Sequence, residues 1–190
     1  MLIKLAILFS GNGSNLENIL KQLHKKTFDK NTFEVVLCIS NNQDAYGIQR
    51  ALKYDINTIV IEHKKFKTRE EFDAKLVELI KQSQVDLTIL AGFMRILSPI
   101  FTQNIKAINI HPSLLPLFKG ANAIKESYES DMKVAGVSVH WVNEELDGGK
   151  IIAQKAFEKE KLNFEEFEEK IHILEHKILP STIVQIFKNN

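Results

Sequence analysis

The sequence predicts an α/β fold: a single domain with a mainly parallel, twisted sheet and helices on both of its faces. Short apolar segments alternate along the chain with segments of helical periodicity, as in strand–helix–strand units with right-handed crossovers. The 190 residues are enough for one domain that buries its own core, and 44% apolar against 26% charged residues is a globular composition. Because we find no repeat, linker or low-complexity tract, we expect one domain over residues 1–190.

Short apolar or alternating segments predict the strands. The first two apolar segments each stop at polar residues that are typical of turns. The apolar segments are residues 2–9, 33–39, 58–61, 86–91 and 107–110. Further along, Val137, Val139 and Trp141 alternate with Ser138 and His140, which predicts a strand with two different faces. Residues 150–157 are the last strand candidate.

Helical periodicity fills the intervals between these strands. A helix with apolar residues at helical spacing follows the first strand, and we expect Asn15 to cap it. Residues 45–52 are also helical in pattern. Thr68 and Glu71 form a capping-box pattern, which places Arg69 in the first turn of the next helix. Residues 162–188 are predicted to be helical with a break near Pro180, because proline lacks the amide hydrogen.

Composition and charge exclude several classes of protein. With 25 basic and 24 acidic side chains the net charge is +1, so we expect no nucleic-acid partner. The single cysteine, Cys38, cannot form an intramolecular disulfide, which favours a reducing compartment and hence a cytoplasmic protein. The apolar run at residues 2–9 carries Lys4 and is far shorter than the roughly 20 residues of a membrane span, so no membrane partner is expected.

The loop Ser10-Gly11-Asn12-Gly13-Ser14-Asn15 joins the first strand to a helix. Glycines let backbone amides turn toward an anion and a helix N-terminus adds partial positive charge, so a phosphate is the natural ligand. The alternative is an ordinary turn, since these residues are turn formers. A dinucleotide site fits poorly, because Leu16 stands where a third glycine belongs. The nucleotide P-loop also fails, because no Gly-Lys-Ser/Thr triplet is present.

Asn109 and His111 lie at the end of the fifth predicted strand, on the same side of it, and Pro112 ends the strand. An amide donor beside an imidazole suits acyl transfer to an amine, because the amide stabilises an oxyanion and the imidazole handles protons near neutral pH. Asp147, before two glycines, would favour the charged imidazole and orient it. The alternatives are side chains that satisfy loop backbone at Asn109 and His111, and a plain turn at Asp147.

Two other patterns are weaker. His172, Glu175 and His176 have the HxxEH spacing of inverted zinc peptidases, but no third ligand is evident, so we expect no metal. Cys38 lies inside an apolar strand, where cysteine is usually inert, and no GxSxG elbow is present. Covalent catalysis is therefore not expected.

Four segments in order carry a resemblance to a known family: SGNGSN at residues 10–15, AGFMRILSP at 91–99, NIHPSLLPLFKG at 109–120 and ELDGG at 145–149. Together they resemble the phosphoribosylglycinamide formyltransferases, folate-dependent enzymes of purine biosynthesis, over nearly the whole chain. The resemblance implies a Rossmann-like formyltransferase fold whose N-terminal half binds the phosphoribosyl group and whose C-terminal half binds folate and is catalytic. The implied substrates are 10-formyltetrahydrofolate and glycinamide ribonucleotide.

The resemblance also implies roles for individual residues. Asn109, His111 and Asp147 match the catalytic trio, Gly13, Ser14 and Asn15 the phosphate contact, Glu175 the residue that holds glycinamide, and Arg69, Met94, Arg95, Ile96, Leu97 and Asn109 the folate contacts. Ser138 and His140 are candidates near the site only. One departure is Ala121-Asn122-Ala123, where related enzymes often carry a histidine, so contacts from that loop are open.

Rival functions remain within and outside this chemistry. Methionyl-tRNA formyltransferase normally adds a C-terminal tRNA-binding domain, and formyltetrahydrofolate hydrolase an N-terminal regulatory domain. Because the first strand begins at Leu2 and the chain ends soon after Pro180, we expect neither. A nonenzymatic phosphate or folate sensor would keep the pockets without the chemistry, and a nicotinamide dehydrogenase is a more distant alternative. The sequence leaves the oligomeric state open.

Overall fold

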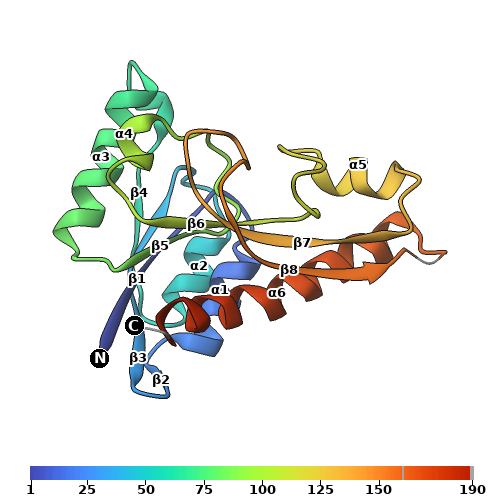
Figure 1. Cartoon of the computed structure of the whole chain (residues 1–190). Coiled ribbons are helices and arrows are strands. Elements are labelled where there is room, and N and C mark those ends of the chain that lie inside the picture. Colours follow the sequence, from blue (N-terminus) through green and yellow to red (C-terminus); the bar gives the residue numbers. More distant parts are fainter. Residues whose placement is uncertain (160, 189–190) are drawn as a thin grey trace.

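The computed structural model describes residues 1–159 and 161–188. Its strands are β1 (Leu2–Phe9), β2 (Lys26–Phe28), β3 (Asn31–Ser40), β4 (Thr58–Val60), β5 (Leu87–Leu90), β6 (Ala107–His111), β7 (Val134–Trp141) and β8 (Ile151–Glu158). They form one eight-stranded sheet in the order β2-β3-β1-β5-β6-β7-β8, with β4 also paired to β3 (Figure 1). The pairs among β1, β3, β4, β5 and β6 are parallel, and β2, β7 and β8 pair antiparallel. The predicted mainly parallel sheet is confirmed.

Helices cover both faces of this sheet, as predicted. The helices are α1 (Ser14–Leu23), α2 (Gly47–Leu52), α3 (Arg69–Gln82), α4 (Pro99–Thr102), α5 (Ala123–Glu129) and α6 (Phe164–Lys188), and His63–Lys65 forms a 3-10 turn. One apolar core packs α1, α2 and α6 against the sheet, and a second packs α3 and α4 against the opposite face (Figure 1). The alternation in β7 follows from this arrangement, because Val137 and Val139 belong to the first core while Ser138 and His140 face the other way.

The start of α1 differs from the prediction. Gly13, with a φ of 72°, is the N-cap, and Asn15 lies inside the first turn rather than at the cap. A left-handed conformation at Gly13 ends the loop earlier than an asparagine cap would, so the side chain of Asn15 is free to reach α6. The cap of α3 is confirmed, because the Glu71 amide donates to Thr68 Oγ1 at 3.1 Å.

The predicted break near Pro180 is wrong, since α6 runs without interruption from Phe164 to Lys188. Proline at this position has no amide to donate to the carbonyl four residues earlier, that of His176. Asn18 on α1 supplies the missing donor, with its Nδ2 2.7 Å from the His176 oxygen. The partner for that carbonyl comes from a helix far away in sequence, so the local pattern could not indicate it.

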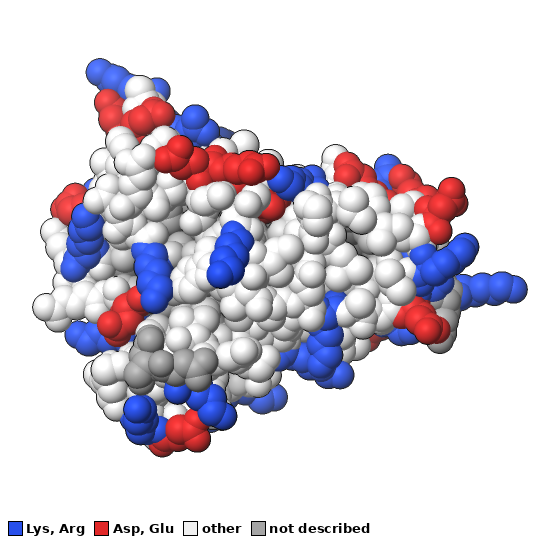
Figure 2. Space-filling model, viewed as in Figure 1, with Lys and Arg blue, Asp and Glu red and all other residues white. Residues whose placement is uncertain are grey.

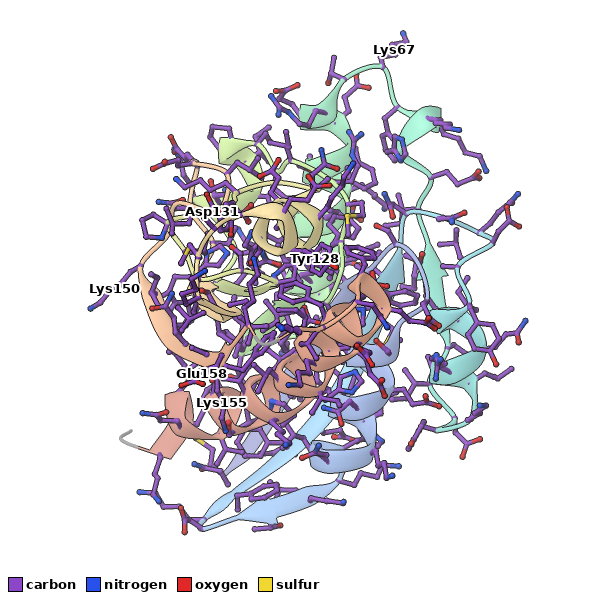
Figure 3. All side chains as sticks on the ribbon, turned by 90° about the vertical axis from the view of Figure 1, so that its right-hand side faces the viewer. Lys67, Tyr128, Asp131, Lys150, Lys155 and Glu158 are labelled. Carbon is purple, nitrogen blue, oxygen red and sulfur yellow. The ribbon has the colours of Figure 1, made fainter. Side chains whose placement is uncertain are left out.

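The segment between β6 and β7 contains α5, which no sequence pattern predicted. The Lys159 ammonium donates to the carbonyls of Ser127, Tyr128 and Ser130 at 2.6–2.8 Å, and so closes the C-terminal end of the helix. Figure 3 shows Tyr128 between α5 and α6, and its ring lies 5.3 Å from that of Phe167. These contacts fix α5 beside the opening of the cavity described below.

The surface drawn in Figure 2 carries basic and acidic side chains interspersed, rather than gathered into one patch of a single sign. In residues 1–159 and 161–188, no helix combines the length and the apolar character that a membrane crossing requires.

Candidate active site

A cavity of about 760 Å³ lies at the carboxyl edge of the parallel strands. Its walls include the loops that follow β1, β5 and β6, together with part of α6. Because these three strands are parallel neighbours, the loops that follow them meet at one edge of the sheet. The structure therefore brings most of the predicted site residues into one cavity: Gly13, Ser14, Asn15, Met94, Arg95, Ile96, Asn109, His111, Asp147 and Glu175.

Asp147 lies between the two predicted catalytic side chains of β6. Its Oδ1 accepts from Asn109 Nδ2 at 3.3 Å, and its Oδ2 lies 3.5 Å from His111 Nδ1. The same Asn109 nitrogen lies 3.1 Å from His140 Nε2. His140 Nδ1 lies 2.9 Å from the Trp141 carbonyl oxygen, and its Nε2 also lies 3.6 Å from Asp147 Oδ1. His140, a near-site candidate from the sequence, is thus part of the cluster.

The cluster is buried and favours the ionised carboxylate. The side chains of His111 and Asp147 are 6% and 7% exposed. Burial would raise the pKa of Asp147, but hydrogen bonds from His140 and the Gly120 amide, with the charges of His111 and His140, hold that pKa below its ordinary value. His111 Nε2 donates to the Phe118 carbonyl at 2.8 Å, so a second proton on Nδ1 would face Asp147. The Asp147 carboxylate therefore faces the Nδ1 side of the His111 ring.

The loop between β7 and β8 folds over β6 to bring Asp147 to the cluster (Figure 1). Asp147 has a φ of 49°, and its Oδ2 accepts from the Gly120 amide at 2.8 Å. At Gly149, two residues on, a Cβ atom would overlap the Trp141 carbonyl oxygen, so only glycine fits there. Gly149 is therefore required by the close return of this loop toward Trp141.

The loop after β1 forms one end of the cavity. Its Gly13 packs so closely on α2 that a Cβ atom there would lie 2.6 Å from the Cα of Gly47. The amides in the first turn of α1 have no acceptors within the helix, which is the arrangement that binds anions. Asn15, 8% exposed, donates to Glu175 Oε2 at 3.1 Å, while its own Oδ1 is buried without a partner. His172 Nδ1 lies 2.9 Å from the same Glu175 oxygen.

The segment after β5 forms the other end of the cavity. Met94 and Ile96 are 69% and 53% exposed, and the Met94 amide donates to Ser10 Oγ at 2.8 Å, which ties this segment to the loop after β1. The Arg95 guanidinium lies 5.6 Å from the ring centre of Phe72. An adjoining cavity of about 80 Å³ is lined by Leu97, Asn109, His140 and Asp147 among others. The segment therefore lies next to the cluster around Asp147.

Arg69 is the one predicted site residue outside both cavities, as far as the described lining shows. It begins α3, where its Nε lies 4.0 Å from Glu70 Oε1. Burial raises the pKa of Asp73, against the hydrogen bonds of Ser98 and the charges of Arg69 and Arg95. The charges of Arg69 and Arg95 thus both act on Asp73.

The structure also shows the surroundings of Ser138 and of residues 121–123, which the sequence singled out. Ser138 Oγ accepts from the Leu115 amide at 3.0 Å and donates to the Ser113 carbonyl at 2.7 Å, so it holds the loop after β6 rather than the cavity wall. Ala121 and Asn122 line the cavity, and Ala123 starts α5. Sequence reasoning missed Gly120 and Phe118, whose backbone atoms hold Asp147 and His111, because main-chain partners leave no residue-type signal.

The patterns considered unlikely from the sequence gain no support as sites. Among residues 1–159 and 161–188, no group of three His, Cys, Asp or Glu side chains is placed to hold a metal ion. Glu175, from the HxxEH pattern, instead bonds Asn15 and His172. Cys38 is buried, and burial raises the pKa of its thiol to about 12, which keeps it protonated and unreactive.

Comparisons with known proteins agree with this arrangement. Residues 3–183 match the formyl transferase family. Phosphoribosylglycinamide formyltransferase of Bacillus subtilis is 39% identical over 98% of this chain and 96% of its own. The trifunctional purine biosynthetic protein adenosine-3 of Gallus gallus is 41% identical over 95% of this chain, which spans 18% of that longer protein. The crystal structure of phosphoribosylglycinamide formyltransferase from Campylobacter jejuni is 73% identical, covers 99% of both chains and superposes with a TM-score of 0.98. The chain therefore belongs to the formyl transferase family and, within it, to the phosphoribosylglycinamide formyltransferases.

Proposed function

We propose that the protein transfers the formyl group of 10-formyltetrahydrofolate to the amine of 5-phosphoribosylglycinamide. The products are formylglycinamide ribonucleotide and tetrahydrofolate, and the reaction is a step of purine biosynthesis. The observation that carries the proposal is the convergence of Asn109, His111 and Asp147 in one cavity that also contains an anion-binding loop. Membership of the phosphoribosylglycinamide formyltransferases supports the same substrates.

The two ends of the cavity suit two different substrates. The phosphate would lie against Gly13, Ser14 and Asn15, with the glycinamide end held by Glu175. The folate would lie along Met94, Arg95, Ile96 and Leu97, with its formyl group at Asn109, while Arg69 would attract the charged end of the folate from outside the cavity. The division into an N-terminal phosphoribosyl-binding half and a C-terminal folate half stays a prediction.

In the proposed reaction the primary amine attacks the formyl carbon, and the carbonyl oxygen becomes an oxyanion. Asn109 and protonated His111 stabilise that charge. In the present structure both donors are held by Asp147, with Asn109 at 3.3 Å and His111 at 3.5 Å. These contacts are long for charge-assisted hydrogen bonds, so each donor can turn toward the oxyanion while Asp147 stays beside it.

The intermediate then collapses by breaking the bond between the formyl carbon and N10. The amine loses a proton and N10 gains one, through His111 or a bound water, so the step is balanced without an added reagent. Asp147 keeps the imidazole of His111 charged and oriented during the step, as its low pKa supports. Since no covalent enzyme intermediate forms, the alignment of both substrates in one cavity supplies much of the acceleration.

The experiment mixes purified protein with both substrates, follows the loss of formyl folate and measures free formate, with and without the amine. We expect formyl folate to be lost only when the amine is present, and formylated ribonucleotide to be formed. Equal loss without the amine, accompanied by formate, would make the protein a hydrolase. Binding of both ligands with no loss in either run would make it a sensor.

A further inference from the structure

Arg50, on α2, is hydrogen-bonded to the loop after β1, which is the proposed phosphate site. Its Nε donates to the Asn12 carbonyl at 2.9 Å, and its Nη2 donates to Asn12 Oδ1 at 3.0 Å. The remaining Nη1 pairs with Glu17 Oε2 on α1, and the guanidinium carbon lies 4.9 Å from the ring centre of Tyr46. The side chain is 20% exposed and is not among the described residues that line the cavity. All three guanidinium nitrogens therefore have a partner.

The contact with the Asn12 carbonyl has a consequence for the next amide. The Asn12 carbonyl and the Gly13 amide belong to one planar trans peptide, so they point in opposite directions. By holding the carbonyl on the side of α2, Arg50 directs the Gly13 amide away from α2. Gly13 lines the cavity, so the direction of its amide decides whether it donates to a bound anion.

Arg50 also offsets a charge that opposes phosphate binding. Glu17 lies in the first turn of α1, where a carboxylate repels an anion at the same helix end. Arg50 and Lys53 both contact it, Lys53 with Nζ 3.7 Å from Glu17 Oε1. Lys53 has no contact with Asn12 among the described hydrogen bonds. A substitution of Lys53 therefore changes the charge near Glu17 without removing a contact to the loop.

We propose that Arg50 is a positioning residue that sets the affinity for the phosphate of the ribonucleotide substrate through Asn12, without touching the substrate. The inference rests on the proposed function, because it takes the loop after β1 as the phosphate site. Lysine cannot replace arginine in this role, because an ammonium lacks the planar fork that reaches both oxygens of Asn12.

The test compares the wild-type protein with Arg50→Lys, and with Lys53→Met as the matched control. In Arg50→Lys we expect KM for the ribonucleotide to rise about tenfold, with kcat and the KM for folate within about twofold. Lys53→Met removes a weak, exposed charge pair with Glu17 and leaves Asn12 held by Arg50, so it should raise that KM by less than about twofold. For a ribonucleoside lacking the 5′-phosphate, Arg50→Lys and wild type should have the same KM, a selectivity that a general loss of packing would not produce.

Equal increases in KM for the phosphorylated and dephosphorylated substrates would overturn the proposal. So would a lower kcat with unchanged KM, or the same increase in Lys53→Met. Isothermal titration calorimetry with inorganic phosphate tests the role of Arg50 in phosphate binding even if the wild-type protein shows no turnover. Weaker phosphate binding in Arg50→Lys than in Lys53→Met would then support the role of Arg50 while the proposed reaction fails, and equal binding would reject it.

Discussion

Asp147 Oδ2 lies 3.5 Å from His111 Nδ1, and both side chains are more than nine-tenths buried. The two residues come from different parts of the chain, the end of β6 and the loop between β7 and β8. The Gly120 amide holds the same carboxylate oxygen at 2.8 Å. This buried pair lies where the proposed reaction transfers a proton.

Asp147→Asn should lower kcat by about a hundredfold or more, because the imidazole of His111 loses the carboxylate that faces its Nδ1. Folate affinity should change far less. Steady-state kinetics together with direct folate titration separate the two effects. The exposed Asp131, labelled in Figure 3, supplies the control, since Asp131→Asn should leave both unchanged. Equal losses in turnover and folate binding would reject the role assigned to Asp147.

Asn109→Leu should lower kcat by about 10²–10³-fold, the usual cost of removing one oxyanion donor. The variant keeps the approximate volume of the side chain but has no amide to donate to the oxyanion. Single-turnover measurements with saturating substrates report the chemical step itself. A variant that retains more than a tenth of the wild-type rate would show that Asn109 only supports Asp147 and His140.

His172 and His176, one turn apart on α6, should give opposite pH dependences of stability. The hydrogen bond to Glu175 raises the pKa of His172. The stability that this interaction contributes is therefore present below the unfolded pKa and is lost as pH rises through the folded pKa. Burial lowers the pKa of His176, so protonation of that residue at low pH opposes folding.

Urea unfolding at about pH 5.5 and about pH 8.5 measures this difference. His172→Gln should destabilise the protein more at the lower pH, and His176→Gln should relieve part of the loss of stability there. Parallel pH profiles for the two variants would contradict the assignment.

Asn18→Ala should destabilise the protein by about 1 kcal/mol, because the His176 carbonyl loses its donor at 2.7 Å and keeps only Gln22 Nε2 at 3.5 Å. In Pro180→Ala the amide at position 180 supplies a helical donor to that carbonyl, so Asn18→Ala should cost less in this background. Denaturant unfolding of the two single variants and the double variant gives the coupling. Additive changes would mean that Asn18 does not replace the hydrogen bond that Pro180 removes.

Local patterns in the sequence were sufficient for most of the elements and for the mainly parallel character of the sheet. Residues 2–9 were predicted as a strand with the bounds that β1 has, and Thr68 does cap α3. The errors arose where a distant residue decides the local structure. Asn18 on α1 lets α6 continue through Pro180, and the close approach of Gly47 favours Gly13 as the start of α1.

The candidate site, too, could be predicted from local patterns only in part. Asn109 and His111 were predicted from residue type and strand position, and Asp147 from its place before two glycines and from the family resemblance. The structure brings the three side chains together. Backbone partners such as the Gly120 amide had no signal in the sequence. Arg50 was missed because a lone arginine on a short helix is typical of a surface, and only its fork on Asn12 distinguishes it.

The most direct test of formyl transfer follows the carbon atom itself. Folate carrying a ¹³C-formyl group is mixed with the protein and the ribonucleotide, and the products are observed by ¹³C NMR. We expect the label to appear on the nitrogen that was the primary amine of the ribonucleotide, at the rate of folate loss, with no labelled formate. Labelled formate formed at the same rate whether or not the amine is present would contradict the account.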